Sequence, residues 1–257
     1  MLILALDTSG QHGSMGLVRG ANEPFEVLEE VSLTGRTYSA RLLPELSGML
    51  ARRHLQLGAL EGFAVISGPG SFTGLRVGLS SIKALAEILG RPIAAISMLE
   101  AVAAQADPGP PDSGLPERQP LVDRRVIAAL DAGRKEVYVG CWGEAGEYGR
   151  TGAGFKLARE SLLSRAEFIS LLEANAVAEL VTPDRALCEL AAGRLRTRLI
   201  PWPAAGEIAR LGLAKLAAGQ TVPVEALDAN YIRRSDAEIF STPQVGRRGA
   251  VKDSYRG

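Results

Sequence analysis

The sequence feature that most constrains the fold is a glycine-rich turn set between an apolar strand and a long helix. Phe63–Ser67 predicts the strand, Gly68–Gly74 forms the turn, and a helix runs from about Leu75 to Leu89. Gly90 then supplies a helix stop, and Ile93–Ile96 predicts a further buried strand. This strand–helix–strand order favours a partly parallel sheet with helices on its faces, and therefore an α/β fold.

The preceding residues extend the pattern. Leu2–Leu6, Met15–Val18 and Val27–Leu33 predict three more strands, separated by short turns. A helix over about 39–54 follows, because apolar residues recur there with helical spacing on one face: Leu42, Leu43, Leu46, Met49 and Leu50. Pro44 lies early in this run, where it either kinks the helix or delays its regular part.

A proline-rich stretch separates the two halves of the chain. Residues 107–120 contain five prolines and two glycines, which excludes a regular helix or a central strand. We interpret the stretch as a loop or linker near a domain boundary, with a surface insertion inside one domain as the alternative. Beyond it we predict two strands and then three helices: Val126–Leu130, Val137–Cys141, Leu162–Ala174, Arg185–Leu195 and Glu207–Ala218.

The two halves share a short similarity. Leu4–Gly10 and Ala129–Gly133 each place an aspartate, Asp7 or Asp131, at the end of an apolar strand and before a turn of small residues. Duplicated domains with a cleft between them would give this pattern. A similarity of five residues also arises by chance, so the pattern alone leaves duplication open.

Charge and composition exclude several classes of function. Lys and Arg together number 29, as do Asp and Glu, and aromatic residues make up only 5% of the chain. Binding of nucleic acid by bulk charge or by an aromatic stacking platform is therefore not expected. The segment 246–257 is locally basic, and we interpret it as a solvated tail, with a local basic patch that contacts nucleic acid as the alternative.

The expected location is the cytoplasm, without a membrane partner. The sequence has no run of 18 apolar residues, and its first residues lack the basic segment of a signal peptide. Its two cysteines stand alone, which fits a reducing compartment.

The sequence predicts no catalytic residue and no metal ligand. His12 and His54 are its only histidines, and neither has a His or Cys at ligand spacing. A Gly-x-Ser-x-Gly nucleophile motif is missing, and no histidine is placed to serve Ser71 as a base.

A nucleotide site is a hypothesis with an equally plausible structural alternative. A glycine-rich turn before a helix can bind phosphate through backbone N–H groups, and the aspartates at two strand ends could hold Mg²⁺. The candidate residues are Asp7, Thr8, Gly68, Gly70, Ser71, Thr73 and Asp131. Alternatively the glycines only shape the turn, Ser71 or Thr73 caps the helix, and each aspartate caps its own turn. The turn after Asp7 is bulky, which weakens the nucleotide interpretation.

The helix over about 75–89 is apolar on two sides. It also carries a stripe of small residues, Gly74, Gly78 and Ser81, which favours close approach of another helix. One side of the helix can cover the sheet. The other side requires a second helix, either from this chain or from a partner subunit.

Four segments together resemble the TsaB (YeaZ) family: Leu4–Ser9, Gly68–Gly78, Ala128–Tyr138 and Tyr231–Arg233. The resemblance extends over roughly residues 1–235, and the run Gly-Pro-Gly-Ser-Phe-Thr-Gly-Leu-Arg is highly specific. It implies an actin/Hsp70-like (ASKHA) α/β fold of two related domains, with mixed sheets covered by helices. We accordingly expect an N-terminal domain at 1–106, a linker at 107–120, a C-terminal domain at 121–240 and a tail at 241–257. The helix at about 206–219 is expected to pack back on the N-terminal domain.

The resemblance also implies a function. The family acts in forming N6-threonylcarbamoyladenosine at position 37 of tRNAs that read ANN codons, as the non-catalytic partner of TsaD, which carries a His-x-x-x-His metal site. The implied partners are a TsaD-like subunit, a TsaE-like ATPase, tRNA through the complex, and a second copy of the chain when it is alone. The chain itself is expected to require no cofactor, with ATP or ADP at the subunit interface.

Two features of the sequence qualify this picture. The missing His-x-x-x-His argues against TsaD itself and against the peptidase activity implied by the older glycoprotease label of the family. Tyr38 stands where family members often have a histidine before the first helix. The competing hypothesis is an independent ATPase or small-molecule kinase of the same fold.

The resemblance places the partner interface on the two N-terminal-domain helices. The residues we expect there are Leu42, Leu46, Leu50, Gly74, Arg76, Val77, Gly78, Ser81 and Leu85.

Overall fold

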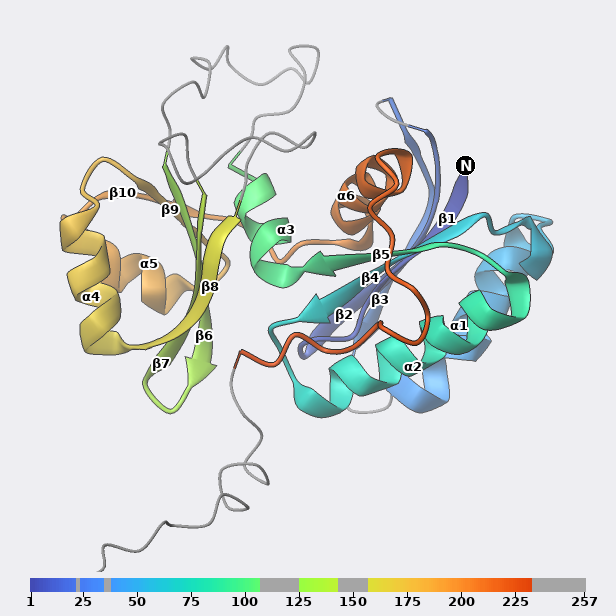
Figure 1. Cartoon of the computed structure of the whole chain (residues 1–257), viewed down its shortest axis with the longest axis horizontal. Helices are drawn as coiled ribbons and strands as arrows, with labels where there is room; N and C mark the ends of the chain where they lie inside the picture. Colours follow the sequence, from blue (N-terminus) through green and yellow to red (C-terminus); the bar gives the residue numbers. More distant parts are fainter. Residues whose placement is uncertain (22–23, 35–37, 107–124, 143–156, 233–257) are drawn as a thin grey trace, which may run out of the picture.

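Two five-stranded mixed sheets form the framework of the molecule (Figure 1). The structure is a computed structural model, and it describes residues 1–21, 24–34, 38–106, 125–142 and 157–232. The proline-rich stretch 107–120 and the tail 241–257 lie outside these residues.

The first sheet has the strand order β3-β2-β1-β4-β5. Its central strand β1 is apolar up to its final aspartate and is buried at every position, as expected of a strand covered on both faces. Strands β4 and β5 run parallel to β1, whereas β2 and β3 are antiparallel. The strand bounds are β1 Leu2–Asp7, β2 His12–Arg19, β3 Glu26–Thr34, β4 Gly62–Gly68 and β5 Ile93–Ser97.

Helices α1 (Tyr38–Arg52) and α2 (Phe72–Leu89) cover one face of this sheet (Figure 1). A short 3-10 turn, η1 (Leu57–Ala59), leads from α1 into β4. Helix α2 begins where the Ser71 side chain accepts a hydrogen bond from the Gly74 N–H, and it ends at Gly90, whose φ is 63°. Pro44 lies in the early part of α1 without ending the helix. Both predicted helices are therefore confirmed.

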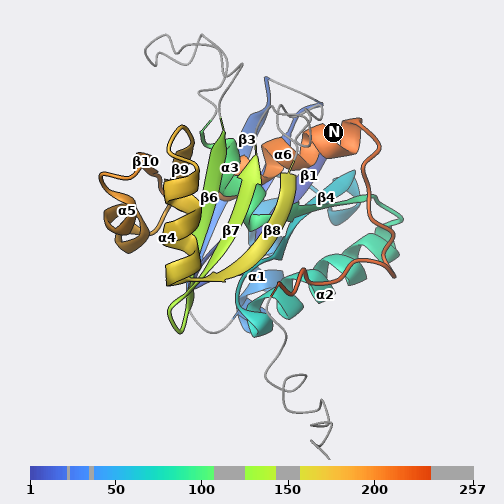
Figure 2. The same cartoon turned by 60° about the vertical axis from the view of Figure 1, so that its left-hand side comes forward.

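The second sheet repeats this arrangement. Its strand order is β10-β9-β6-β7-β8, with β9 and β10 parallel to β6, and β7 and β8 antiparallel. The strand bounds are β6 Val126–Gly133, β7 Glu136–Trp142, β8 Leu157–Ser164, β9 Glu179–Thr182 and β10 Arg196–Leu199. Helices α4 (Arg165–Ala174) and α5 (Arg185–Ala191) cover its outer face (Figure 2). The same order of strands and helices in both halves confirms an actin-like fold of two related parts.

The last helix of each half lies between the two sheets. Helix α3 (Met98–Ala104) follows the first sheet but packs on β6 and β7 of the second. Helix α6 (Ala205–Ala217) follows the second sheet but packs on β1, β4 and β5 of the first. The chain thus crosses between the halves twice, and the main core cluster includes residues from both sheets.

Most errors of the sequence prediction lie in the second half. The helix predicted at Leu162–Ala174 begins only at Arg165, because residues 162–164 complete β8 and pair with β7. Ser164 ends the strand and caps α4 through a reciprocal capping box with Glu167. The helix predicted at Arg185–Leu195 ends at Ala191, and strands β8, β9 and β10 were not predicted. In the first half, helix α3 was not predicted either.

Among the described residues, none of the helices is both long enough and apolar enough to cross a bilayer.

Candidate functional site

A cleft of about 1020 Å³ opens between the two halves, at the ends of β1 and β6. The glycine-rich turn and the start of α2 form one wall, and the turn after β6 forms the opposite wall. Its lining residues are Ser9, Gly10, Gln11, His12, Tyr38, Ser39, Pro69, Gly70, Ser71, Thr73, Gly74, Val77, Leu130, Asp131, Ala132, Tyr138 and Trp202. The cleft thus includes four of the seven predicted nucleotide-site residues.

Asp7 does not reach this cleft. It is 1% exposed, and its Oδ1 atom accepts a hydrogen bond of 2.7 Å from the Ser9 N–H. Burial raises the pKa of its carboxyl group to about 6, although the hydrogen bonds from Ser9 oppose the shift. Asp7 therefore fixes its own turn, as the structural alternative predicts, and is not placed to hold a metal in the cleft.

Thr8 connects the first strand to α2. Its hydroxyl group donates a hydrogen bond of 2.8 Å to the Gly74 carbonyl oxygen. A Cβ at Gly74 would overlap the Thr8 carbonyl oxygen, and a Cβ at Gly78 would overlap the Thr8 hydroxyl oxygen. The small residues at these two positions therefore make room for the Thr8 turn and not for another helix, which corrects the interpretation of the small-residue stripe. Ser81, the third member, donates to the Val77 carbonyl of its own helix.

The glycine-rich turn is stabilised largely by the chain itself. The Ser71 N–H donates to the Ser9 carbonyl oxygen at 2.6 Å, and a Cβ at Gly70 would collide with Ser9. Gly68 has a φ of 130° and lies against the Asn230 carbonyl oxygen, so no side chain fits there. Gly70, Ser71 and Thr73 nevertheless remain exposed and line the cleft.

Asp131 is the only one of the two strand-end aspartates that faces the cleft. Its Oδ1 atom accepts from the Gly133 N–H at 3.3 Å, and its own N–H donates to Asp184 Oδ2 at 2.7 Å. Burial raises the pKa of Asp184; the hydrogen bond from the Asp131 N–H opposes this shift, and the Asp131 charge adds to it. Within the described ranges, no three His, Cys, Asp or Glu side chains gather as a metal site would require.

Several cleft residues were not predicted from the sequence. Tyr38 closes one side by donating a hydrogen bond of 2.6 Å to the Gly10 carbonyl oxygen, and its pKa is raised by burial and then by Asp7. Tyr138 was noticed only as part of a family motif. Trp202 comes from the segment between β10 and α6, which carries no signal that would have identified it. A planar or phosphorylated ligand would meet these aromatic rings and the start of α2.

A second concave surface, the α1–α2 groove, lies beside the cleft and has a volume of about 530 Å³. It is lined by Ser39, Leu42, Leu43, Phe72, Thr73, Arg76, Val77, Ser80 and Ser81. Leu43 is 57% exposed and Phe72 is 40% exposed, and both line this one concave surface. Because Ser39, Thr73 and Val77 line both the groove and the cleft, the two are continuous.

Aromatic and cationic groups order one edge of the groove. The Arg76 guanidinium lies 3.8 Å from the centre of the Phe72 ring, and the Phe72 and Tyr231 ring centres are 5.2 Å apart. Arg76 Nε also donates a hydrogen bond of 3.1 Å to the Tyr231 hydroxyl oxygen. The groove edge is thus held partly by the C-terminal segment.

Four of the nine predicted interface residues line the groove, and five do not. Arg76, Val77, Ser81 and Leu42 line the groove, although Leu42 is almost fully buried. The other five are core residues that cover the sheet or contact Thr8: Leu46, Leu50, Gly74, Gly78 and Leu85. Helical spacing shows which residues share a face, but it does not show which of two apolar faces points inward. Leu43 and Phe72 were therefore missed as surface residues.

Comparison with known proteins shows which family the chain resembles in sequence and structure. Residues 29–188 match the family model for TsaD, described as tRNA N6-adenosine threonylcarbamoyltransferase. The chain is 31% identical over 142 residues to a Bacillus subtilis protein named tRNA threonylcarbamoyladenosine biosynthesis protein TsaB, covering 55% of each chain. The chain thus spans about half the length of that curated relative.

Two further matches extend over most of the chain. The Escherichia coli protein of the same name is 29% identical over 248 residues, covering 92% of this chain and 96% of the relative. The solved structure of YeaZ from Pseudomonas aeruginosa superposes with a TM-score of 0.66 at 26% identity, covering 90% of this chain and 99% of that chain.

Proposed function

Because the chain belongs to the TsaB (YeaZ) branch of the tRNA N6-adenosine threonylcarbamoyltransferase family, we propose that it is a non-catalytic scaffold subunit. It would activate a TsaD-type catalytic subunit by forming a heterodimer with it. The complex would form N6-threonylcarbamoyladenosine at position 37 of tRNAs that read ANN codons, in the cytoplasm.

The non-catalytic role is supported by the residues that the chain lacks. Its only histidines are His12 and His54, so the sequence contains no His-x-x-x-His pair. Asp7, the one carboxylate at the strand end of the first half, is buried against the Ser9 N–H. Neither these two histidines nor Asp7 could hold a catalytic metal ion in the way expected of TsaD.

The α1–α2 groove is the observation that carries the proposal. Leu43 and Phe72 expose apolar surface beside the half-buried Val77, and Arg76 is held over Phe72. Exposed large apolar side chains around a groove are typical of a protein–protein contact, and an ordered Arg next to an aromatic ring is a common contact anchor. The groove continues into the cleft, so a bound partner would also close over it. ATP or ADP would then lie between the subunits, and a TsaE-type ATPase and tRNA would join this pair.

The test is complex formation with the TsaD-type subunit from the same source. We expect wild type to form a 1:1 heterodimer in size-exclusion chromatography with light scattering, and to support tRNA modification in a reconstituted assay. Leu43→Glu would place a charge in the groove and weaken the heterodimer at least about tenfold. Val177→Glu is the matched control, because Val177 is 81% exposed and lies in the second half, away from the groove.

Failure of the wild-type chain to bind the catalytic subunit or to support modification would refute the proposal. Equal losses for Leu43→Glu and Val177→Glu would place the interface elsewhere. A homodimer that persists in the presence of the catalytic subunit would mean that a second copy occupies the groove.

An independent ATPase or small-molecule kinase remains the second candidate, favoured by the cleft between the halves. It requires that the isolated chain binds Mg²⁺-ATP and that Asp131→Ala, on the cleft wall, weakens this binding. Calorimetry that detects no binding at millimolar ATP would remove this candidate.

A further inference from the structure

The C-terminal residues 228–232, which we call the strap, lie along the start of α2 (Figures 1 and 2). The chain reaches them after the Val222 N–H donates to the Ile93 carbonyl oxygen at the edge of the first sheet. The Asn230 N–H then donates a hydrogen bond of 2.7 Å to the Ser67 carbonyl oxygen near the end of β4. Gly68 lies directly under the Asn230 carbonyl, where any Cβ would come within 2.8 Å of it. The strap is therefore seated on the glycine that opens the glycine-rich turn.

On one side, the strap supports the edge of the α1–α2 groove. Tyr231 accepts a hydrogen bond from Arg76 and places its ring against Phe72. Arg76 and Phe72 line the groove, whereas Tyr231 does not. The position of two groove residues thus depends on a residue of the strap.

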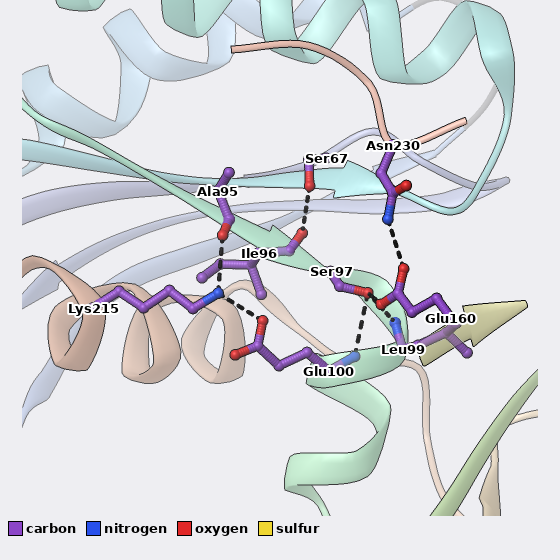
Figure 3. A network of polar contacts seen from close by, with 9 residues as sticks. All are labelled: Ser67, Ala95, Ile96, Ser97, Leu99, Glu100, Glu160, Lys215 and Asn230. Atoms are coloured by element: carbon purple, nitrogen blue, oxygen red, sulfur yellow. Dashed lines mark hydrogen bonds and ion pairs between the residues drawn. The ribbon is translucent and has the colours of Figure 1, made fainter. Parts of the chain in front are cut away.

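On the other side, the strap contacts the second half of the molecule. Asn230 Nδ2 donates a hydrogen bond of 2.6 Å to Glu160 Oε2, and Glu160 lies on β8, the edge strand of the second sheet (Figure 3). The other carboxylate oxygen of Glu160 accepts from the Ser97 hydroxyl group. Ser97 caps α3 by accepting from the Leu99 and Glu100 N–H groups, at the first crossing between the halves.

Glu160 therefore joins three parts of the fold that are distant in sequence. It is itself on the second sheet, Ser97 marks the crossing, and Asn230 belongs to the strap (Figure 3). The neighbouring charges do not replace these contacts, because Lys215 Nζ pairs with Glu100 Oε2 at 2.7 Å and donates to the Ala95 carbonyl oxygen. Removal of the Glu160 carboxylate would leave the Asn230 amide without this partner.

We infer that Glu160 is a positioning residue for the α1–α2 groove. It anchors the strap, and the strap sets Tyr231 against Phe72 and Arg76, so the groove edge is ordered only when the two halves hold the observed arrangement. The role of the groove in partner binding rests on the proposed function, but the anchoring does not.

The first test is hydrogen exchange on the isolated full-length chain. Glu160→Ala should raise amide exchange in peptides covering 226–232 and 72–77 about tenfold or more, because a hydrogen-bonded charge is lost. Peptides from β6 and β7 serve as an internal reference and should not change. Glu160→Gln should restore near wild-type exchange, because Gln can accept from Ser97 while the Asn230 amide turns over to accept from it. Unchanged exchange in 226–232 after Glu160→Ala would overturn the inference.

A second variant separates the strap from its anchor. Tyr231→Ala should loosen residues 72–77 while leaving the capped start of α3 protected. It also keeps the inference testable if Glu160→Ala does not fold. Protection of residues 72–77 equal to wild type in Tyr231→Ala would show that the strap does not order the groove edge.

Partner affinity provides the readout that a merely structural role would not change. Glu160→Ala and Tyr231→Ala should each weaken binding of the TsaD-type subunit about tenfold, whereas Glu160→Gln and Val177→Ala should not. Raised exchange with unchanged affinity would overturn the positioning role. If wild type does not bind that subunit, the proposed function fails, and the exchange data still decide whether Glu160 anchors the strap.

Discussion

The carboxyl group of Asp7 is titratable and fully buried, so the stability of the fold depends on pH through this residue. Its pKa is raised from 3.8 to about 6, so the folded state binds the proton more tightly than the unfolded state does. This contribution to stability is fully present below pH 3.8 and is lost as the pH rises through about 6.

Asp7→Asn should therefore stabilise the protein at high pH. The amide still accepts from the Ser9 N–H but never ionises, so we expect a gain of about 1–3 kcal/mol at pH 8 that shrinks toward pH 5. Urea unfolding at both pH values measures it, with Glu87→Gln on the exposed side of α2 as the control. An equal loss of stability at both pH values would contradict this account of Asp7.

The contact between Thr8 and α2 predicts that Thr8→Ala rescues the stability of a substitution at Gly78 but not of one at Gly74. Gly78→Ala should cost about 1–3 kcal/mol through overpacking against the Thr8 hydroxyl oxygen, and Thr8→Ala should recover much of that loss. Gly74→Ala should not be rescued, because its obstacle is the Thr8 carbonyl oxygen. A double-mutant cycle from denaturant unfolding measures the coupling.

Gly48→Ala is the matched control for these two variants. It lies in the interior of α1, where a Cβ would meet only the flexible end of Arg52. We expect this variant to be neutral or to gain up to about 1 kcal/mol from helix propensity. Additive effects of Thr8→Ala and Gly78→Ala would argue against the direct contact.

At the residue scale, the sequence predicted local capping hydrogen bonds well, but it did not predict which side of a helix faces the sheet. The alternative in which Asp7 and Ser71 cap local structure agrees with their hydrogen bonds, because such caps depend on neighbours in the chain. The burial of Leu46 and the exposure of Leu43 depend on which side of α1 meets the sheet. That choice is made by tertiary packing, which local spacing does not encode.

At the element scale, the junction between β8 and α4 depends on Ser164. Its hydroxyl oxygen accepts from the Glu167 N–H at 3.3 Å, and its own N–H donates to Glu167 Oε2 at 2.8 Å. Ser164→Ala should lower the free energy of unfolding by about 1 kcal/mol, because the first turn of α4 loses its cap. Thermal unfolding measures it, and Ser170→Ala is the control, since that hydroxyl bonds only within α4. Equal effects of the two substitutions would exclude a special role for the cap.

Most of the elements that the sequence did not predict are short. Strands β9 and β10 contain four residues each and helix α3 contains seven, and such short runs do not establish a period. Strand β8, with eight residues, was also missed. The predicted helix at Leu162–Ala174 started too early, because Leu162 pairs with Tyr138 across the sheet as part of β8. Long elements such as α2 were predicted well, because their caps and glycine stop act locally.

At the scale of the whole molecule, the shared core predicts cooperative unfolding. Trp142 and Leu130 of the second sheet belong to the same buried cluster as Ile3 of the first, with α3 and α6 between them. Calorimetry should therefore show one transition with equal van't Hoff and calorimetric enthalpies. Phe168→Leu, in the outer cluster of the second half, should shift that whole transition to lower temperature. Two resolved transitions would mean that the halves unfold separately.

The overall architecture was predictable only through family resemblance. The short similarity around Asp7 and Asp131 left duplication open, whereas the complete repeat of strand order is visible only in the structure. The cleft residue Trp202 is brought to the site by the second crossing of the chain, a long-range event without a local sequence signal.

Because α3 and α6 each pack on the sheet of the other half, the order of synthesis affects how the chain folds. Every strand of the first sheet lies before residue 98, but α6, which covers one of its faces, ends at residue 217. A ribosome that has released only the first half would therefore present a sheet with an uncovered apolar face. Nascent or prematurely terminated chains of this length should bind chaperones and aggregate, and the N-terminal half becomes complete only when synthesis is nearly finished.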